Sequence, residues 1–217
     1  MDQAKTLPVL NAEELRVLGV LMEKSKTTPE YYPMTINSIT AACNQKTSRK
    51  PVVQYDEQTV TLTLDILKRK GLISTATGGS SRAIKYKHNF AIVFPVTPQE
   101  VAILCLLMLR GSQTPGELNT NSGRLYEFES LEEVQSVLER LSDPEMPYVL
   151  QLPKRAGQKE TRYTHLLSGI PDLTQDEVTD EHYSKPATEL ESRLAKVEEE
   201  LAELKTAFEQ LMKELMG

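Results

Sequence analysis

A cluster of cationic and hydroxyl side chains near residue 48 has the chemistry of a phosphate-contacting loop. Lys46, Ser48, Arg49 and Lys50 lie within five consecutive positions. Lysine and arginine bring charged N–H donors and serine brings a neutral O–H donor, and these groups bind nucleic-acid phosphates. The other interpretation is a charged loop that contacts only solvent. The first interpretation predicts a binding site rather than a catalytic one.

The sequence contains no clear catalytic or metal-binding motif. His88, His165 and His182 lack the spacing of metal ligands, and no Gly-Lys-Ser/Thr loop that could hold a nucleotide is present. Cys43 and Cys105 cannot form a zinc site alone. Both are expected to pack in a core, although Cys43 would be reactive if it were exposed beside the cationic cluster. We therefore expect no enzymatic activity, no metal and no cofactor, and a structural role for the strand-end histidines.

Short blocks of sequence occur twice along the chain. Glu14 to Leu18 returns as Glu100 to Leu104, and Thr28-Pro29 returns as Thr114-Pro115, both at an offset of 86. Nearer the ends of the two copies, 85–88 returns as 162–165 at an offset of 77. The smaller offset predicts extra residues in the first copy, between about Cys43 and Tyr55. Two similar modules in tandem favour a bidentate binding protein, which contacts its partner through both modules, over an enzyme with a single active-site pocket.

Each copy predicts three helices followed by a β-hairpin. Apolar residues at helical spacing follow six helix starts, several of them with a capping box. These starts are Asn11, Thr35, Asp56, Thr97, Thr114 and Ser130. Segments 72–76 and 82–88, joined by a turn over 77–81, predict the first hairpin, and 148–152 with 161–166 predict the second.

Three helices and a hairpin is the order of a winged helix-turn-helix module. We predict a mainly α protein with small β-hairpins, of the α+β class, built from two tandem winged-helix domains over 8–94 and 95–168. An acidic linker is expected over 169–185, where Gly, Pro, Asp, Thr and Ser predominate. A C-terminal coiled-coil helix is expected over 186–217.

Several blocks of residues resemble the YceH-like family of bacterial proteins. They run from Glu23-Lys24 through Thr27 to Pro33, from Ala42 to Val52, from Arg110 to Leu118 and from Arg162 to Leu166. The resemblance covers about residues 11–168 and leaves the C-terminal extension outside. It implies a tandem winged-helix fold. It carries no catalytic or binding residues over to this chain.

The C-terminal extension has the apolar spacing of a coiled coil. Eight apolar residues follow one another at alternating intervals of four and three, which forms an unbroken heptad seam. They are Leu190, Leu194, Val197, Leu201, Leu204, Phe208, Leu211 and Leu215. A seam this narrow predicts self-association, with a homodimer as the simplest form. Folding back onto the same chain and pairing with a different protein are the two alternatives.

Charge divides the chain into a basic head and an acidic tail. Residues 1–94 carry a balance of +5, residues 95–170 one of −3 and residues 171–217 one of −8, which gives the formal net charge of −6. The chain has no apolar run long enough to cross a membrane, and the residues after Met1 lack the basic start and apolar stretch of a signal peptide, so we expect no secretory leader. We therefore expect a cytoplasmic protein without a membrane partner.

The winged-helix prediction places candidate nucleic-acid contacts on the cationic loop, on the third helix of the first copy and on both wings. Gln58 and Thr61 could reach base edges, whereas Asp56 and Glu57 at the start of that helix would repel phosphates. The third helix of the second copy is acidic. The full set is Lys46, Ser48, Arg49, Lys50, Gln58, Thr61, Lys68, Arg69, Arg82, Lys85, Lys154, Arg155 and Lys159.

Two functions follow from these expectations. The first is a non-enzymatic, dimeric DNA-binding protein with a regulatory role, which contacts phosphates through the cationic loop and the wings. The alternative is an adaptor that holds other proteins with its winged-helix domains and does not bind DNA.

Overall fold

The computed structural model describes residues 7–76, 83–154 and 160–171, which belong to one compact unit that ends at Pro171. The fold is mixed α+β and mostly helical. The first repeat comprises α1 (Ala12–Thr27), the 3-10 helix η1 (Pro29–Tyr31), α2 (Ile36–Cys43), α3 (Glu57–Arg69), β1 (Ile73–Ala76) and β2 (Lys85–His88). After α4 (Phe90–Val93), the second comprises α5 (Pro98–Arg110), α6 (Pro115–Ser122), α7 (Leu131–Leu141), β3 (Val149–Gln151) and β4 (Tyr163–His165).

The predicted helix starts are confirmed, and side chains cap them. The Asn11 side chain accepts a hydrogen bond from the Glu14 backbone N–H at 2.8 Å, and the Glu14 carboxylate accepts one from the Asn11 N–H at 2.8 Å. The same reciprocal arrangement opens α5 and α6, and single side-chain caps open α2, α3 and α7. Local sequence therefore determines where each of these helices begins, because each cap satisfies N–H groups without a partner in the helix.

The two hairpins occupy equivalent places in the two repeats. β1 pairs antiparallel with β2, and β3 pairs antiparallel with β4. In each repeat the residue just before the cap of the second helix adds a further bridge to the return strand, Met34 to Tyr86 and Gln113 to Tyr163. Tyr86 and Tyr163 are the residues that the repeat pairs at an offset of 77. The structure thus confirms the duplicated order of elements.

The extra residues of the first repeat are only partly where the offsets predicted them. The connection between α2 and α3 runs over 44–56, against 123–130 between α6 and α7. A second part lies between α1 and α2, where Thr28-Pro29 opens η1, whereas its counterpart Thr114-Pro115 opens α6. The similarity of the two Thr-Pro pairs is therefore not a structural equivalence. The short helices η1 and α4 were not predicted, because neither is long enough to show a helical period.

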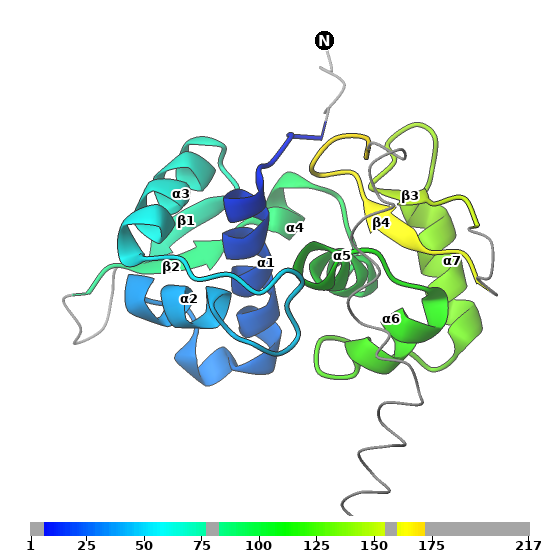
Figure 1. Cartoon of the computed structure of the whole chain (residues 1–217), viewed down its shortest axis with the longest axis horizontal. Helices are drawn as coiled ribbons and strands as arrows, with labels where there is room; N and C mark the ends of the chain where they lie inside the picture. The colour runs from blue at the N-terminus through cyan, green and yellow to red at the C-terminus, as the bar shows by residue number, and fades with distance from the viewer. Residues whose placement is uncertain (1–6, 77–82, 155–159, 172–217) are drawn as a thin grey trace, which may run out of the picture. The chain divides into compact units, whose positions relative to one another are not determined.

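The repeats lie side by side and pack through their first helices, α1 and α5 (Figure 1). The Cys105 thiol donates to the Gly19 carbonyl oxygen at 3.4 Å, and these residues are 86 positions apart, which is the repeat offset. Equivalent positions therefore meet, as they do when like units pack about an approximate two-fold axis. A Cβ at Gly19 would lie 3.0 Å from the Leu109 side chain, so glycine allows this close approach. One continuous apolar core extends through both repeats.

Several predictions fall on residues outside the described ranges. They are the turn over 77–81, the contacts Arg82, Arg155 and Lys159, nearly all of the linker, and the whole heptad segment from Leu190 to Leu215. The boundary between residues 94 and 95 falls between α4 and α5 and stays a prediction. Within the described ranges, no helix has the length and apolar character needed to cross a membrane.

Candidate functional site

The loop 44–56 between α2 and α3 is anchored from inside the fold by Arg49. The Arg49 side chain is fully buried, and its two terminal nitrogens donate to the Glu23 carboxylate at 3.0 and 2.6 Å. Arg49 is one of the predicted phosphate contacts. That assignment does not fit the structure, because the guanidinium points into the protein and its charge is paired there.

Further hydrogen bonds fix the course of the same loop. Arg49 also donates to the carbonyl oxygens of Ala42 and Ser48, at distances from 2.8 to 3.3 Å. Arg16 of α1 donates to the carbonyl oxygens of Cys43 and Pro51. The loop is therefore held at its beginning and near its middle by two buried arginines. Such a preorganised loop loses little conformational freedom when its exposed side chains bind a partner.

Glu23 is a charged group at the base of this loop. Burial raises the pKa of its carboxyl, but the hydrogen bonds and positive charge of Arg49, with the charge of Lys24, lower the pKa further than burial raises it. The net pKa is below its ordinary value, so Glu23 is ionised near neutral pH. The Lys24 ammonium lies 3.2 Å from the same carboxylate. Glu23 thus compensates two neighbouring cations.

The remaining loop residues of the predicted set are on the surface. Lys46, Ser48 and Lys50 are exposed. Ser48 has a backbone φ of 60°, in the left-handed region that residues other than glycine rarely adopt. Its hydroxyl accepts a hydrogen bond from Arg110 of the second repeat at 2.9 Å. The loop therefore connects the repeats as well as presenting lysines to solvent.

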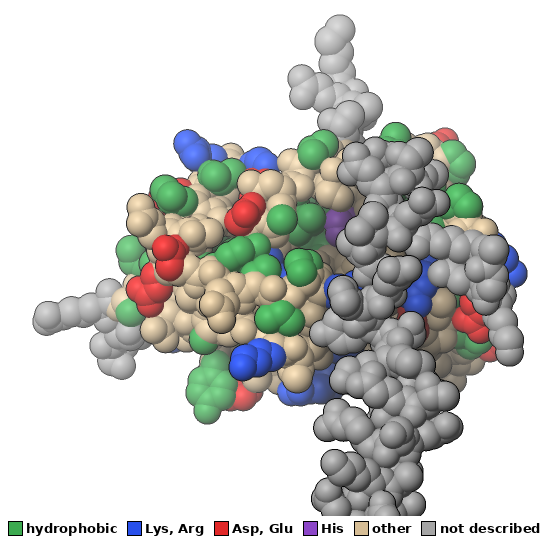
Figure 2. All heavy atoms as spheres, in the orientation of Figure 1, with side chains coloured by type: hydrophobic (Ala, Val, Ile, Leu, Met, Phe, Trp, Pro, Cys, Tyr) green, Lys and Arg blue, Asp and Glu red, His purple; other side chains and the backbone are tan. Residues whose placement is uncertain are grey.

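The outward face of α3 carries both predicted contacts and groups that oppose DNA binding. Gln58, Lys68 and Arg69 are exposed, while Thr61 is half-buried and donates its hydroxyl to the Glu57 carbonyl oxygen. Figure 2 shows acidic side chains over the N-terminal end of α3 on this face, and Lys and Arg side chains below the loop 44–56. The exposed carboxylates of Asp56 and Glu57 lie at that helix end, as predicted.

Two of the predicted wing contacts, Lys85 and Lys154, lie within the described residues. Lys85 on β2 is half-buried, and Lys154 after β3 is exposed. His88 and His165 occupy equivalent strand ends, paired with Ile73 and Val149. Burial lowers the pKa of each imidazole to about 4, and the charge of a nearby lysine contributes at His88. Both histidines are therefore neutral near pH 7, and their structural role stays a prediction.

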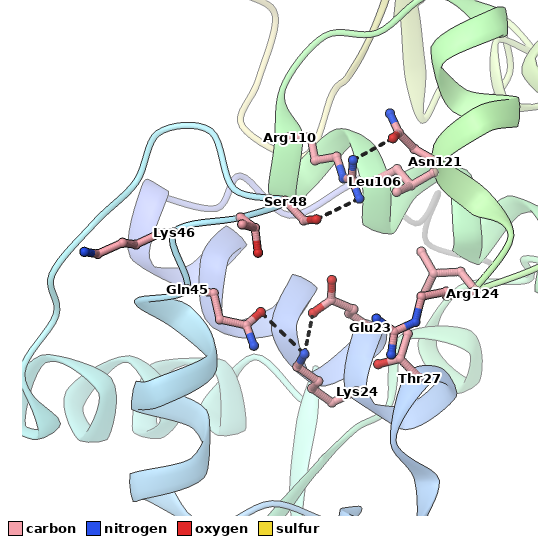
Figure 3. Close-up of a pocket in the computed structure, with 12 residues that line it drawn as sticks. Glu23, Lys24, Thr27, Gln45, Lys46, Ser48, Leu106, Arg110, Asn121 and Arg124 are labelled. Carbon is pink, nitrogen blue, oxygen red and sulfur yellow. Dashed lines mark hydrogen bonds and ion pairs between the residues drawn. The ribbon is translucent and has the colours of Figure 1, made fainter. Parts of the chain in front are cut away.

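A cleft of about 300 Å³ lies between the two repeats, beside the loop (Figure 3). Lys24 and Glu23 of α1 line it from the first repeat, and Arg110, Asn121 and Arg124 line it from the second. Arg110 donates to the Asn121 side-chain oxygen at 2.7 Å. Burial is the largest influence on the pKa of Arg110 and lowers it. We call this feature the inter-repeat cleft.

Lys24, Arg110 and Arg124 are absent from the predicted set of contact residues, although the sequence holds one signal for two of them. Lys24 and Arg110 are separated by 86 positions, so they are equivalent residues of the two copies. Each lies in the last turn of the first helix of its repeat. Arg124 follows α6, and the repeat gives no similar reason to expect it in the cleft. Within the described residues, no group of three or more potential metal ligands occurs.

Comparison with known proteins identifies the family. The model of the family described as "Protein of unknown function, DUF480" matches residues 10–158. The chain belongs to this family. It is 46% identical over 201 residues to a UPF0502 protein from Solibacter usitatus, with 93% of this chain and 95% of that protein covered. A UPF0502 protein from Shewanella halifaxensis is 43% identical over 211 residues, with 94% and 98% covered.

The matched segment contains every residue that lines the inter-repeat cleft, although β4 of the second repeat lies beyond its end. A UPF0502 protein from Opitutus terrae is 49% identical over 172 residues, which cover 79% of this chain and 75% of that protein. These findings agree with the expected membership of a family of bacterial proteins. The narrower resemblance to YceH-like proteins stays a prediction.

Proposed function

We propose that this protein is a non-enzymatic, dimeric DNA-binding protein with two tandem winged-helix domains. In this proposal the loop 44–56 and the wings contact DNA phosphates. The observation that carries it is the buried Arg49, which holds the loop so that Lys46 and Lys50 stay on the surface. Charged donors on a preorganised loop are well suited to phosphate oxygens, since electrostatic attraction supplies most nonspecific affinity for DNA.

The arrangement of secondary structure supports the winged-helix assignment. Each repeat has three helices and a hairpin, and the bridge before the second helix adds a third short extended segment to that hairpin. In such modules the third helix enters the major groove and the wing contacts the backbone. Here α3 carries two exposed cations at its C-terminal end, Lys68 and Arg69, and the return strand β2 carries Lys85, which pairs with Ala76 at the far end of the hairpin.

The composition of α3 predicts weak discrimination between DNA sequences. Leu62 is 58% exposed near the middle of the helix, and Asp65 is exposed one turn later. Carboxylates at the N-terminal end would repel phosphates as that end approached the groove. Gln58 remains a donor and acceptor for base edges. Phosphate contacts are therefore expected to dominate, with strong dependence on salt.

The test is equilibrium binding of the full chain to labelled duplex DNA at low salt, measured by fluorescence anisotropy. We expect binding to weaken as salt rises, and Lys46→Gln to lower the magnitude of the slope of log affinity against log salt by about 1. Lys26→Gln removes the same charge from an exposed position of α1 outside the loop and serves as the control. Absence of DNA binding at low salt would refute the proposed DNA-binding function.

The proposed dimer rests on the heptad segment, which lies outside the described residues. Sedimentation of the full chain and of a chain ending at Ser168 separates the possibilities. We expect a dimer for the first and a monomer for the second, because only the first keeps the apolar seam. Equal, monomeric masses would refute the dimer.

The adaptor function is the second candidate, and the surface of α7 favours it. Glu132 and Glu139 are exposed on this helix together with Gln135, so the face that would read DNA is acidic. Such a face suits a basic protein partner and repels phosphate. The adaptor function would be supported by two results together. The protein would fail to bind DNA, and it would capture one basic protein that the double variant Glu132→Gln/Glu139→Gln does not capture.

A further inference from the structure

The inter-repeat cleft gathers positive charge from both repeats. Lys24 comes from the end of α1, Arg110 from the end of α5 and Arg124 from the residues after α6. Because Lys24 and Arg110 are equivalent repeat positions, the cleft lies beside the contact of α1 with α5 that relates the two copies. Such a position lets one ligand contact both halves of the duplicated unit.

Positive charge in the cleft exceeds negative charge. Glu23 is the one acidic residue among the described residues that line it, and Arg49 and Lys24 already pair with that carboxylate. Arg110 and Arg124 are left without a carboxylate partner in the described part of the chain. Burial lowers the pKa of Arg110, and the like charge of Arg49 lowers it further against the opposing effect of Glu23. A bound anion would stabilise this partly buried cation.

The cleft also holds donors that are oriented and unused. Ser48 and Asn121 fix the Arg110 guanidinium by one hydrogen bond each, at 2.9 and 2.7 Å (Figure 3). A guanidinium has five N–H donors, so others remain for a ligand. Thr27 lines the same cleft, and its hydroxyl oxygen is buried and has no hydrogen-bond partner among the described residues. In Figure 3 the Lys46 side chain points away from the cleft.

We propose that the inter-repeat cleft binds a small phosphorylated molecule, with its phosphoryl oxygens between Lys24, Arg110 and Arg124. Arginine and lysine donors around phosphoryl oxygens form charge-assisted hydrogen bonds. The hydroxyl of Thr27 supplies a neutral donor beside them. A volume of about 300 Å³ lies at the small end of ligand pockets and excludes a duplex. Lys46 also borders the cleft, but its side chain points away from it (Figure 3), so this site and the proposed DNA surface use different side chains.

The ligand is expected to act on the junction of the repeats. It contacts α1 on one side and the residues after α6 on the other, so binding adds contacts across the packed first helices. A ligand that binds only the folded protein raises its melting temperature in proportion to the logarithm of its concentration. Ser48 borders the cleft, belongs to the loop 44–56 and is hydrogen-bonded to Arg110. A ligand held by Arg110 would therefore lie next to the loop that is proposed to contact DNA.

The probe is inorganic pyrophosphate, added to the full chain at constant ionic strength. We expect saturating pyrophosphate to raise Tm by about 4 °C or more and to give one site per chain in calorimetry. Arg124→Gln should reduce its affinity at least about tenfold, because it removes a charge-assisted contact. Lys26→Gln lies on the opposite side of α1 from Lys24 and should leave affinity unchanged. Arg124 is exposed, so its replacement leaves the fold intact.

Two further arms separate this site from DNA binding and from general anion effects. Arg124→Gln should bind duplex DNA as wild type does, because Arg124 lies outside the proposed DNA contacts. Loss of DNA affinity in this variant, together with no response to pyrophosphate, would assign the cleft to the DNA surface and overturn the proposal. An equal rise of Tm with sodium sulfate, or equal pyrophosphate affinity in Arg124→Gln, would also overturn it.

Discussion

Replacing Arg49 tests whether this residue anchors the loop or contacts DNA. Arg49→Gln removes both bonds to Glu23 and leaves the Ala42 and Ser48 carbonyl oxygens without these donors. Breaking a buried ion pair costs about 3–5 kcal/mol. We expect about 3 kcal/mol, the lower end of that range, because the Glu23 side chain keeps 14% exposure and retains Lys24 as a partner.

Urea unfolding followed by circular dichroism measures this change. For a protein of this size the loss corresponds to a fall in Tm of about 6–12 °C. A double-mutant cycle with Glu23→Gln should give a coupling energy of about 1–3 kcal/mol, since the residues contact each other. Lys46→Gln, at the surface of the same loop, should change the free energy of unfolding by less than about 0.5 kcal/mol. Wild-type stability of Arg49→Gln with lost DNA affinity would show that Arg49 contacts phosphate directly.

The same ion pair has a predictable dependence on pH. The pKa of Glu23 is lowered in the folded protein, so the unfolded chain binds the proton more readily as pH falls. The stabilisation is therefore present above the ordinary pKa of 4.5 and is lost as pH falls through the lower folded pKa. In Arg49→Gln this part of the acid-induced loss should be smaller. An unchanged acid profile would contradict the pairing.

Three more predictions concern the core. Gly19→Val should lower the free energy of unfolding, measured in urea, by about 2 kcal/mol or more, because the new side chain enters the contact of α1 with α5. Gly123→Ala is the control, because the space around Gly123 is open, and it should leave the free energy of unfolding nearly unchanged. The pKa values of His88 and His165 are lowered to about 4, so the unfolded state binds more protons below 6.5, and stability should fall from pH 6.5 towards 4. Replacing both histidines with Gln should flatten that interval, and an unchanged slope would contradict their burial. Burial raises the pKa of Cys43 to about 12, so an aromatic disulfide reagent should not modify it before unfolding.

Local rules account for the parts of the fold that the sequence predicted well. The caps at Asn11, Thr97 and Thr114 need only residues three positions away, so their signal is contained in a short window. The strands were placed to within a few residues at each end by their change of period. The duplicated blocks gave an independent reason to expect the same elements twice.

Long-range contacts account for the parts that it predicted less well. Arg49 and its neighbours in the cationic cluster look alike in sequence, and its burial depends on Glu23, which lies 26 positions earlier. The inter-repeat cleft depends on how α1 packs against α5, which the apolar patterns of single helices do not specify. The spacing of Lys24 and Arg110 was visible in the repeat, but their convergence required the packed structure. The short helices η1 and α4 offered too few residues for a periodic signal.

The most direct test of DNA binding by the anchored loop is the salt dependence of affinity in wild type and in Lys46→Gln/Lys50→Gln. For wild type we predict a steep fall in affinity with rising salt, as expected when several phosphates are contacted. In the double variant the magnitude of the slope should be lower by about 2. Identical slopes for the two proteins, or no binding by wild type at low salt, would contradict the account.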